Sequence, residues 1–138
     1  MKFITTLTAA ALMAMGGMAQ AEDSALVLGK LGYETNCAVC HGADAKGGGS
    51  VGELFEVKPS DLTLLAKANG GHFPFAEVYH NIVEGMAERG HGNSEMPIWG
   101  DYFMADAFED RGVNAADAMF MAAGRALALA YYLESVQE

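Results

Sequence analysis

Two cysteines and a histidine stand close together in the segment Cys37-Ala38-Val39-Cys40-His41. This C-x-x-C-H spacing is the pattern for covalent attachment of haem, in which the two thiols add to the porphyrin vinyl groups and the imidazole binds the iron. On one helical turn both sulfurs reach the same edge of the porphyrin, and the next side chain projects toward the metal. The pattern therefore predicts one covalently bound haem c per chain, attached through Cys37 and Cys40, with His41 as an axial iron ligand.

Other kinds of site use a similar cysteine spacing. A thioredoxin-like redox pair is expected in a βαβ context, whereas this sequence carries almost no strand signal. A zinc site needs a second group of ligands, whereas His72, His80 and His91 are scattered along the chain. The histidine directly after Cys40 therefore favours haem attachment over a redox pair, a zinc site or a structural disulfide.

The second axial position of the iron needs a further side chain, and Met96 is the best candidate. It precedes Pro97 in a segment without helical periodicity, and the proline restricts the backbone, so the thioether can be held toward the iron. His91 and an open sixth position are the alternatives. Core packing accounts for the other methionines beyond residue 21, which are Met86, Met104, Met119 and Met121.

Two further side chains are candidates for contact with the haem propionates. Trp99 either donates its indole N–H to a propionate or packs as an ordinary aromatic side chain. Arg89 either pairs with a propionate or forms an exposed salt bridge.

The first residues have the three-part pattern of a secretory signal peptide. Lys2 is followed by an apolar run over residues 3–15 and by small residues that end at Ala19-Gln20-Ala21. We expect cleavage after Ala21, a periplasmic location, and a single domain over residues 22–138. The apolar run is shorter than the about 20 residues that a membrane span needs, so no span is expected after cleavage.

The chain is acidic, with 18 Asp and Glu residues against 8 Lys and Arg residues and a formal net charge of −10. Such a charge argues against nucleic acid as a partner. It serves either solubility or the steering of encounters with a basic docking surface on a redox partner.

Hydrophobic periodicity and capping residues predict an all-α domain of three to five helices, with long loops wrapped around one cofactor. Ser60 or Asp61 and Asn114 are suitable N-caps, and Pro74 opens a helix that stops at Gly85. The predicted helices cover residues 24–36, 60–68, 74–84 and 115–136, and the predicted loops cover residues 42–59 and 86–100.

Small and aromatic residues recur on one face of the first predicted helix. Ala25, Gly29, Tyr33 and Cys37 are spaced every fourth residue. A second helix can therefore approach closely over Gly29 and lie against the ring of Tyr33.

Taken together, these features resemble the class I c-type cytochromes, in particular the small bacterial periplasmic ones with one haem. The resemblance implies the class I cytochrome c fold, in which the first and last helices cross, so that Gly29 and Tyr33 meet Leu129 and Tyr132. Besides the haem-attachment motif it is carried by Gly29 and Tyr33 ahead of Cys37, Lys58-Pro59-Ser60-Asp61-Leu62-Thr63, Met96-Pro97-Ile98-Trp99-Gly100 and Leu129-Ala130-Tyr131-Tyr132-Leu133.

One position departs from that family's pattern. Many relatives have a proline roughly a dozen residues after the haem histidine, and its carbonyl accepts the N–H of the histidine ring. This chain has Glu53 there. The acceptor for His41 must then be another loop carbonyl, near residues 51–52 or at Pro59.

With His41 and Met96 both on the iron, no position is open for a substrate. We therefore expect a non-enzymatic, one-electron carrier between respiratory or periplasmic redox proteins, present as a monomer or in weak complexes. A fixed haem subunit of a periplasmic dehydrogenase or reductase is one alternative. A haem enzyme or gas sensor with an open sixth position is the other.

Overall fold

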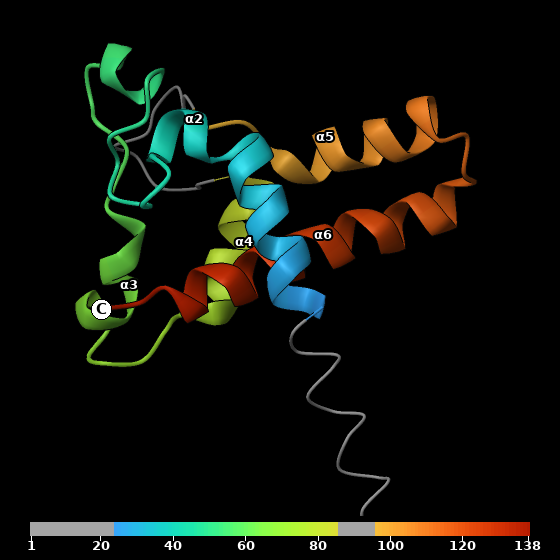
Figure 1. Ribbon diagram of the computed structural model, residues 1–138. Helices are drawn as coiled ribbons and strands as arrows, with labels where there is room; N and C mark the ends of the chain where they lie inside the picture. The colour runs from blue at the N-terminus through green and yellow to red at the C-terminus, as the bar shows by residue number, and fades with distance from the viewer. Residues whose placement is uncertain (1–23, 86–95) are drawn as a thin grey trace, which may run out of the picture.

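The described residues of the computed structural model are 24–85 and 96–138, and they form helices, turns and loops without a strand (Figure 1). This confirms the predicted all-α class. The first helix covers residues 24–36. It is followed by α2 (Ala38–His41), the 3-10 turns η1 (Gly52–Leu54) and η2 (Leu62–Leu64), α3 (Leu65–Ala68), α4 (Phe75–Glu84), α5 (Trp99–Ala105), the π-helical turn η3 (Asp106–Asp110) and α6 (Ala115–Ser135).

The first helix crosses α6 at Gly29 (Figure 1). A Cβ atom at Gly29 would overlap the carbonyl oxygen of Ala128 and lie 2.8 Å from Cβ of Tyr132, so the two backbones touch at this point. One turn later, the rings of Tyr33 and Tyr132 lie 5.2 Å apart. The crossing implied by the resemblance is therefore present, with Ala128 rather than Leu129 as the nearest neighbour of Gly29.

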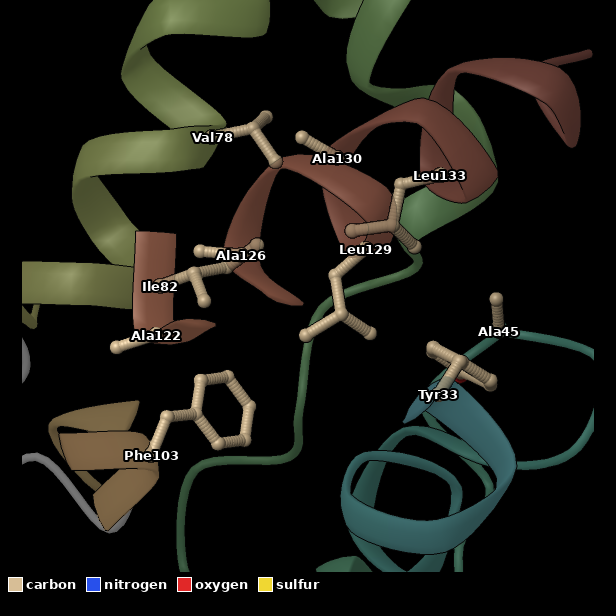
Figure 2. Close-up of a cluster of buried hydrophobic side chains, with 10 residues drawn as sticks. All are labelled: Tyr33, Ala45, Val78, Ile82, Phe103, Ala122, Ala126, Leu129, Ala130 and Leu133. Atoms are coloured by element: carbon tan, nitrogen blue, oxygen red, sulfur yellow. The ribbon is translucent and has the colours of Figure 1, made fainter. Parts of the chain in front are cut away.

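The described hydrophobic core gathers around α6. Every fourth residue of α6 from Ala118 to Ala130 is a buried alanine, and this small-residue face lets α4 and α5 pack closely against it. Figure 2 shows the larger side chains of the same core: Tyr33 from the first helix, Val78 and Ile82 from α4, Phe103 from α5, and Leu129 and Leu133 from α6 itself.

Four predicted helix boundaries are confirmed. The carboxylate of Asp61 accepts the N–H of Thr63 at the start of η2, and the side chain of Asn114 accepts the N–H of Asp117 at the start of α6. Pro74 and Gly85 bracket α4. In each case a residue with a strong local preference stands where a helix must begin or end.

The predicted loop over residues 86–100 is wrong at its end, because α5 begins at Trp99 and continues through η3 to Asp110. The N-cap residue of α5, Ile98, forms no side-chain hydrogen bond to the first turn. The sequence therefore contains no capping residue that would predict the start of α5. Gly100 lies inside α5, where a Cβ atom would overlap the carbonyl oxygen of Val83 on α4. The close packing of the two helices therefore requires glycine at this position. α5 and α6 run side by side (Figure 1). Arg125 of α6 forms a 2.6 Å ion pair with Asp106, the first residue of η3.

The glycine-rich loop after His41 covers the backbone of α2. The N–H groups of Gly47, Gly49 and Val51 donate to the carbonyls of His41, Cys40 and Val39 at 2.7, 3.1 and 2.9 Å. These are carbonyls at the end of a short helix, which need partners from elsewhere in the chain. The loop, which contains η1, therefore fixes the conformation of the cysteine motif.

The crossing at Gly29 predicts a large difference between two glycine substitutions. Gly29→Ala should lower the free energy of unfolding by about 1–3 kcal/mol, because the added methyl group overlaps the backbone of α6. Gly124→Ala, also in a helix but facing open space, should raise it by about 0.5–1 kcal/mol. Denaturant unfolding of both variants measures the difference, and equal effects would contradict the close crossing.

The loop over α2 offers a second matched pair. A Cβ at Gly49 would lie 2.5 Å from the carbonyl oxygen of Val39 and 2.6 Å from that of Cys40, whereas a Cβ at Gly48 meets nothing. Gly49→Ala should therefore cost about 1–3 kcal/mol of stability. Gly48→Ala should change stability by less than about 0.5 kcal/mol, measured in the same unfolding experiment.

Candidate functional site

A cavity lies between the end of the first helix, α4 and α6. Its volume is about 140 Å³, and it is open on one side. Most of its lining is apolar, and the walls include Tyr33, Cys37, His41, Leu62, Leu65, Val78, Ile82, Met96, Trp99, Leu129 and Leu133. The cavity thus brings together Cys37, His41 and Met96, three of the four site residues predicted from the sequence.

The two cysteines follow directly from the first helix. The N–H of Cys37 donates to the carbonyl of Tyr33 at 2.8 Å, and the N–H groups of Cys40 and His41 both donate to the carbonyl of Cys37. Cys37 lies in the cavity wall, whereas Cys40 lies one turn further on, partly buried and outside the cavity lining. The two cysteines are not joined by a disulfide.

Burial changes the chemistry of the Cys37 thiol. Loss of solvent, with a smaller contribution from the neighbouring Cys40, raises the pKa of Cys37 to about 12. The sulfur is therefore protonated at neutral pH and is a poor nucleophile on its own. A buried, protonated thiol differs from the low-pKa cysteine of a thioredoxin-like redox pair.

His41 points its Nδ1 atom at the backbone carbonyl of Ser60, 3.4 Å away. Burial lowers the pKa of His41, while the contact with Ser60 partly offsets this effect. The imidazole is therefore neutral at pH 7, which is the form that binds a metal through Nε2. The acceptor was expected near residues 51–52 or Pro59, and the carbonyl that Nδ1 contacts is that of Ser60, directly after Pro59.

Glu53, at the position of that proline, has another role. Its carboxylate lies 2.8 Å from Nζ of Lys58 in an exposed ion pair. The same Nζ donates to the backbone carbonyl of Glu53 at 2.7 Å.

The hydroxyl of Tyr33 is a site contact that the sequence did not reveal. It donates a buried 2.7 Å hydrogen bond to the carbonyl of Gly42, the residue after His41. Burial, the first of several causes, raises the pKa of Tyr33 well above its usual range, so the donor proton stays in place. The four-residue spacing of Tyr33 and Cys37 predicted that both lie on one helix face. The contact with Gly42 could not be predicted, because it depends on the turn of the chain after α2.

The structure separates the methionines into different environments. Met96 lines the cavity, and Met104 packs against the core. The prediction that Met119 packs in the core is wrong, because its side chain is 63% exposed. The neighbouring Ala118 occupies the buried face of α6 instead. Met86 lies outside the described residues.

The weaker candidates are only partly placed. Trp99 lines the cavity and packs edge-on against Tyr102, with ring centroids 5.3 Å apart, so packing is shown and the propionate bond stays a prediction. His72 and His80 are exposed. The alternative iron ligand His91 and the propionate candidate Arg89 lie outside the described residues.

These residues fit a covalently held haem. The cavity is apolar and open on one side, its wall contains a cysteine sulfur and a neutral imidazole, and Met96 adds a thioether. An imidazole and a thioether are the side chains that ligate the iron of cytochromes c, and cysteine sulfurs attach the porphyrin. Within the described ranges, no three His, Cys, Asp or Glu side chains cluster in a way that would hold a metal ion.

Comparison with known proteins agrees with this geometry. The sequence profile of the Cytochrome c family matches residues 26–137, from the first helix to just beyond α6. Neither the curated proteins nor the solved structures contain a significant match. Because the profile covers most of the sequence, the chain belongs to the cytochrome c family, whose members carry covalently attached haem c and transfer electrons through its iron.

Proposed function

We propose that this chain is a periplasmic one-electron carrier whose haem is attached through Cys37 and Cys40 and ligated by His41 and Met96. One observation carries the proposal: Cys37, His41 and Met96 line a single apolar cavity, although Met96 is distant from the other two in sequence. A cavity with this donor set has the composition of a six-coordinate haem site.

The cysteines provide permanent attachment. Cys37 and Cys40 would hold the porphyrin through thioether bonds, each formed by addition of S–H across a vinyl double bond with no net oxidation. Because both cysteines follow the rigid first helix, the attachment edge is fixed relative to the crossing at Gly29.

The axial side chains determine which chemistry is open. When bound, haem c supplies a one-electron couple between ferrous and ferric iron. Ligation by both His41 and Met96 would leave no iron position for substrate, and the thioether of Met96 would favour the ferrous state. Leu62, Leu65 and Leu129 line the cavity and limit the access of water. This arrangement supports electron transfer rather than catalysis at the metal.

The location and partners follow from sequence features. The expected signal peptide over residues 1–21, which lies outside the described residues, supports export to the periplasm. No helix in the described part of the chain is long and apolar enough to cross a bilayer. The net charge of −10 favours redox partners that present a basic docking surface and bind weakly, with no nucleic acid.

Replacing Met96 tests the axial ligation. Met96→Ala should remove the sulfur-to-iron charge-transfer band of the ferric protein, lower the reduction potential and allow rapid binding of carbon monoxide to the ferrous protein. Met119→Ala is the matched control, because Met119 is exposed on α6. If Met96→Ala kept the potential and visible spectrum of the parent, Met96 would not be an iron ligand.

Replacing the cysteines tests the attachment. The denatured parent chain, matured in a host that attaches haem c, should retain the mass of one haem and remain coloured. Each of Cys37→Ala and Cys40→Ala should leave a single thioether, and the double variant should lose the haem on denaturation. Mass spectrometry under denaturing conditions measures this directly, and a parent chain at bare peptide mass would refute the proposal.

A further inference from the structure

The last two residues of the chain bind the segment that follows Ser60. The side-chain Nε2 of Gln137 donates to the carbonyls of Leu62 and Leu133 at 2.8 and 2.7 Å, and its Oε1 accepts the N–H of Ala66 at 2.8 Å. The backbone N–H of Glu138 donates to the carbonyl of Thr63 at 2.9 Å. Residues 62–66 are therefore tied to the C-terminal end of α6.

These hydrogen bonds join two walls of the cavity. Leu62 belongs to η2 and Leu133 to α6, and both side chains line the cavity. Their carbonyls share one donor group, the amide of Gln137. Because this hydrogen bond is partly buried, loss of the amide would remove the acceptor of the Ala66 N–H in a region of limited access to water.

The opposite side of the same segment is also fixed. The N–H of Leu62 donates to the carbonyl of Ala45 at 2.8 Å, and Asp61 accepts both the N–H and the hydroxyl of buried Thr63. Ser60 precedes this segment, and its carbonyl lies 3.4 Å from Nδ1 of His41. That separation is long for a hydrogen bond, so a small displacement of the segment would break it.

We propose that Gln137 is a positioning residue for the haem: by holding residues 62–66 it keeps the Ser60 carbonyl against His41, and so it sets the reduction potential of the iron. The inference rests on the proposed function, because it requires His41 to be an iron ligand. A hydrogen bond from Nδ1 makes the imidazole a stronger donor to the metal, which favours ferric iron. Loss of the bond therefore raises the potential.

The test compares Gln137→Met with Ser135→Ala in the haem-loaded protein. Gln137→Met keeps the length of the side chain and removes all three of its hydrogen bonds, whereas Ser135→Ala removes an exposed bond to Tyr132 at the same end of α6. Gln137→Met should shift the one-electron equilibrium about threefold to tenfold toward the reduced form, where tenfold corresponds to 59 mV. Ser135→Ala should leave the potential unchanged. Spectroelectrochemical titration measures both.

A second measurement separates positioning from general loosening. In Gln137→Met the Nδ1 proton of His41 should exchange with solvent faster than in the parent, as followed by NMR of the reduced protein. If Gln137→Met does not accumulate with haem, Thr63→Val loosens the same segment by removing the hydroxyl bond to Asp61, and it should shift the potential in the same direction.

The outcomes are distinct. If Gln137→Met and Thr63→Val both kept the reduction potential of the parent, with an intact spectrum, the role of Gln137 would be overturned. A lower potential would overturn it too, because it would indicate entry of water through a loosened wall, which stabilises the ferric charge. If the parent protein itself showed no histidine-ligated haem, the proposed function would fail, which is a different result from a failure of the variants.

Discussion

The contact between the backbones of the first helix and α6 at Gly29 determines where the cavity can form. Tyr33 and Cys37 lie one and two turns beyond Gly29, and Leu129 and Leu133 directly follow the contact residues Ala128 and Tyr132 on α6. These four side chains all line the cavity. The depth of the cavity and the position of Cys37 therefore depend on how closely the two helices approach. This close approach is possible because Gly29 has no side chain.

The cysteine motif is rigid because its backbone is bonded on several sides. The loop over residues 47–51 donates to the carbonyls of α2, and the hydroxyl of Tyr33 holds Gly42. A four-residue helix has little stability of its own, since the cost of starting a helix is spread over few hydrogen bonds. The conformation of α2 is therefore held by hydrogen bonds from outside it. The glycine-rich loop has an irregular backbone because it supplies these hydrogen bonds.

Much of this arrangement could be predicted from the sequence, because local signals specify it. The caps at Asp61 and Asn114, the glycine stop at Gly85 and the spacing of Gly29 and Tyr33 are short-range features with direct physical causes. The motif at residues 37–41 predicted the family that the profile match then showed. The axial role of Met96 stays a prediction, although its place in the cavity agrees with it.

Features that depend on tertiary contacts could not be predicted in this way. α5 starts without a cap and contains Gly100, so only its packing against α4 and α6 accounts for it. The choice of Ser60 as the partner of His41 depends on how the chain returns from η1. The bonds of Gln137 to Leu62 and Ala66 join residues more than half the chain apart. No local pattern encodes such pairs.

The crossing of the first helix with α6 also has a consequence for the order of folding. The crossing pairs segments from opposite ends of the domain and so requires closure of a long loop. Because closure of a long loop costs entropy, we expect this contact to form late in folding. A chain that enters a compartment N-terminus first presents its thiols well before α6 arrives to complete the wall. Sequence order thus leaves an interval in which a large planar prosthetic group can reach the cysteines without any unfolding of a finished domain.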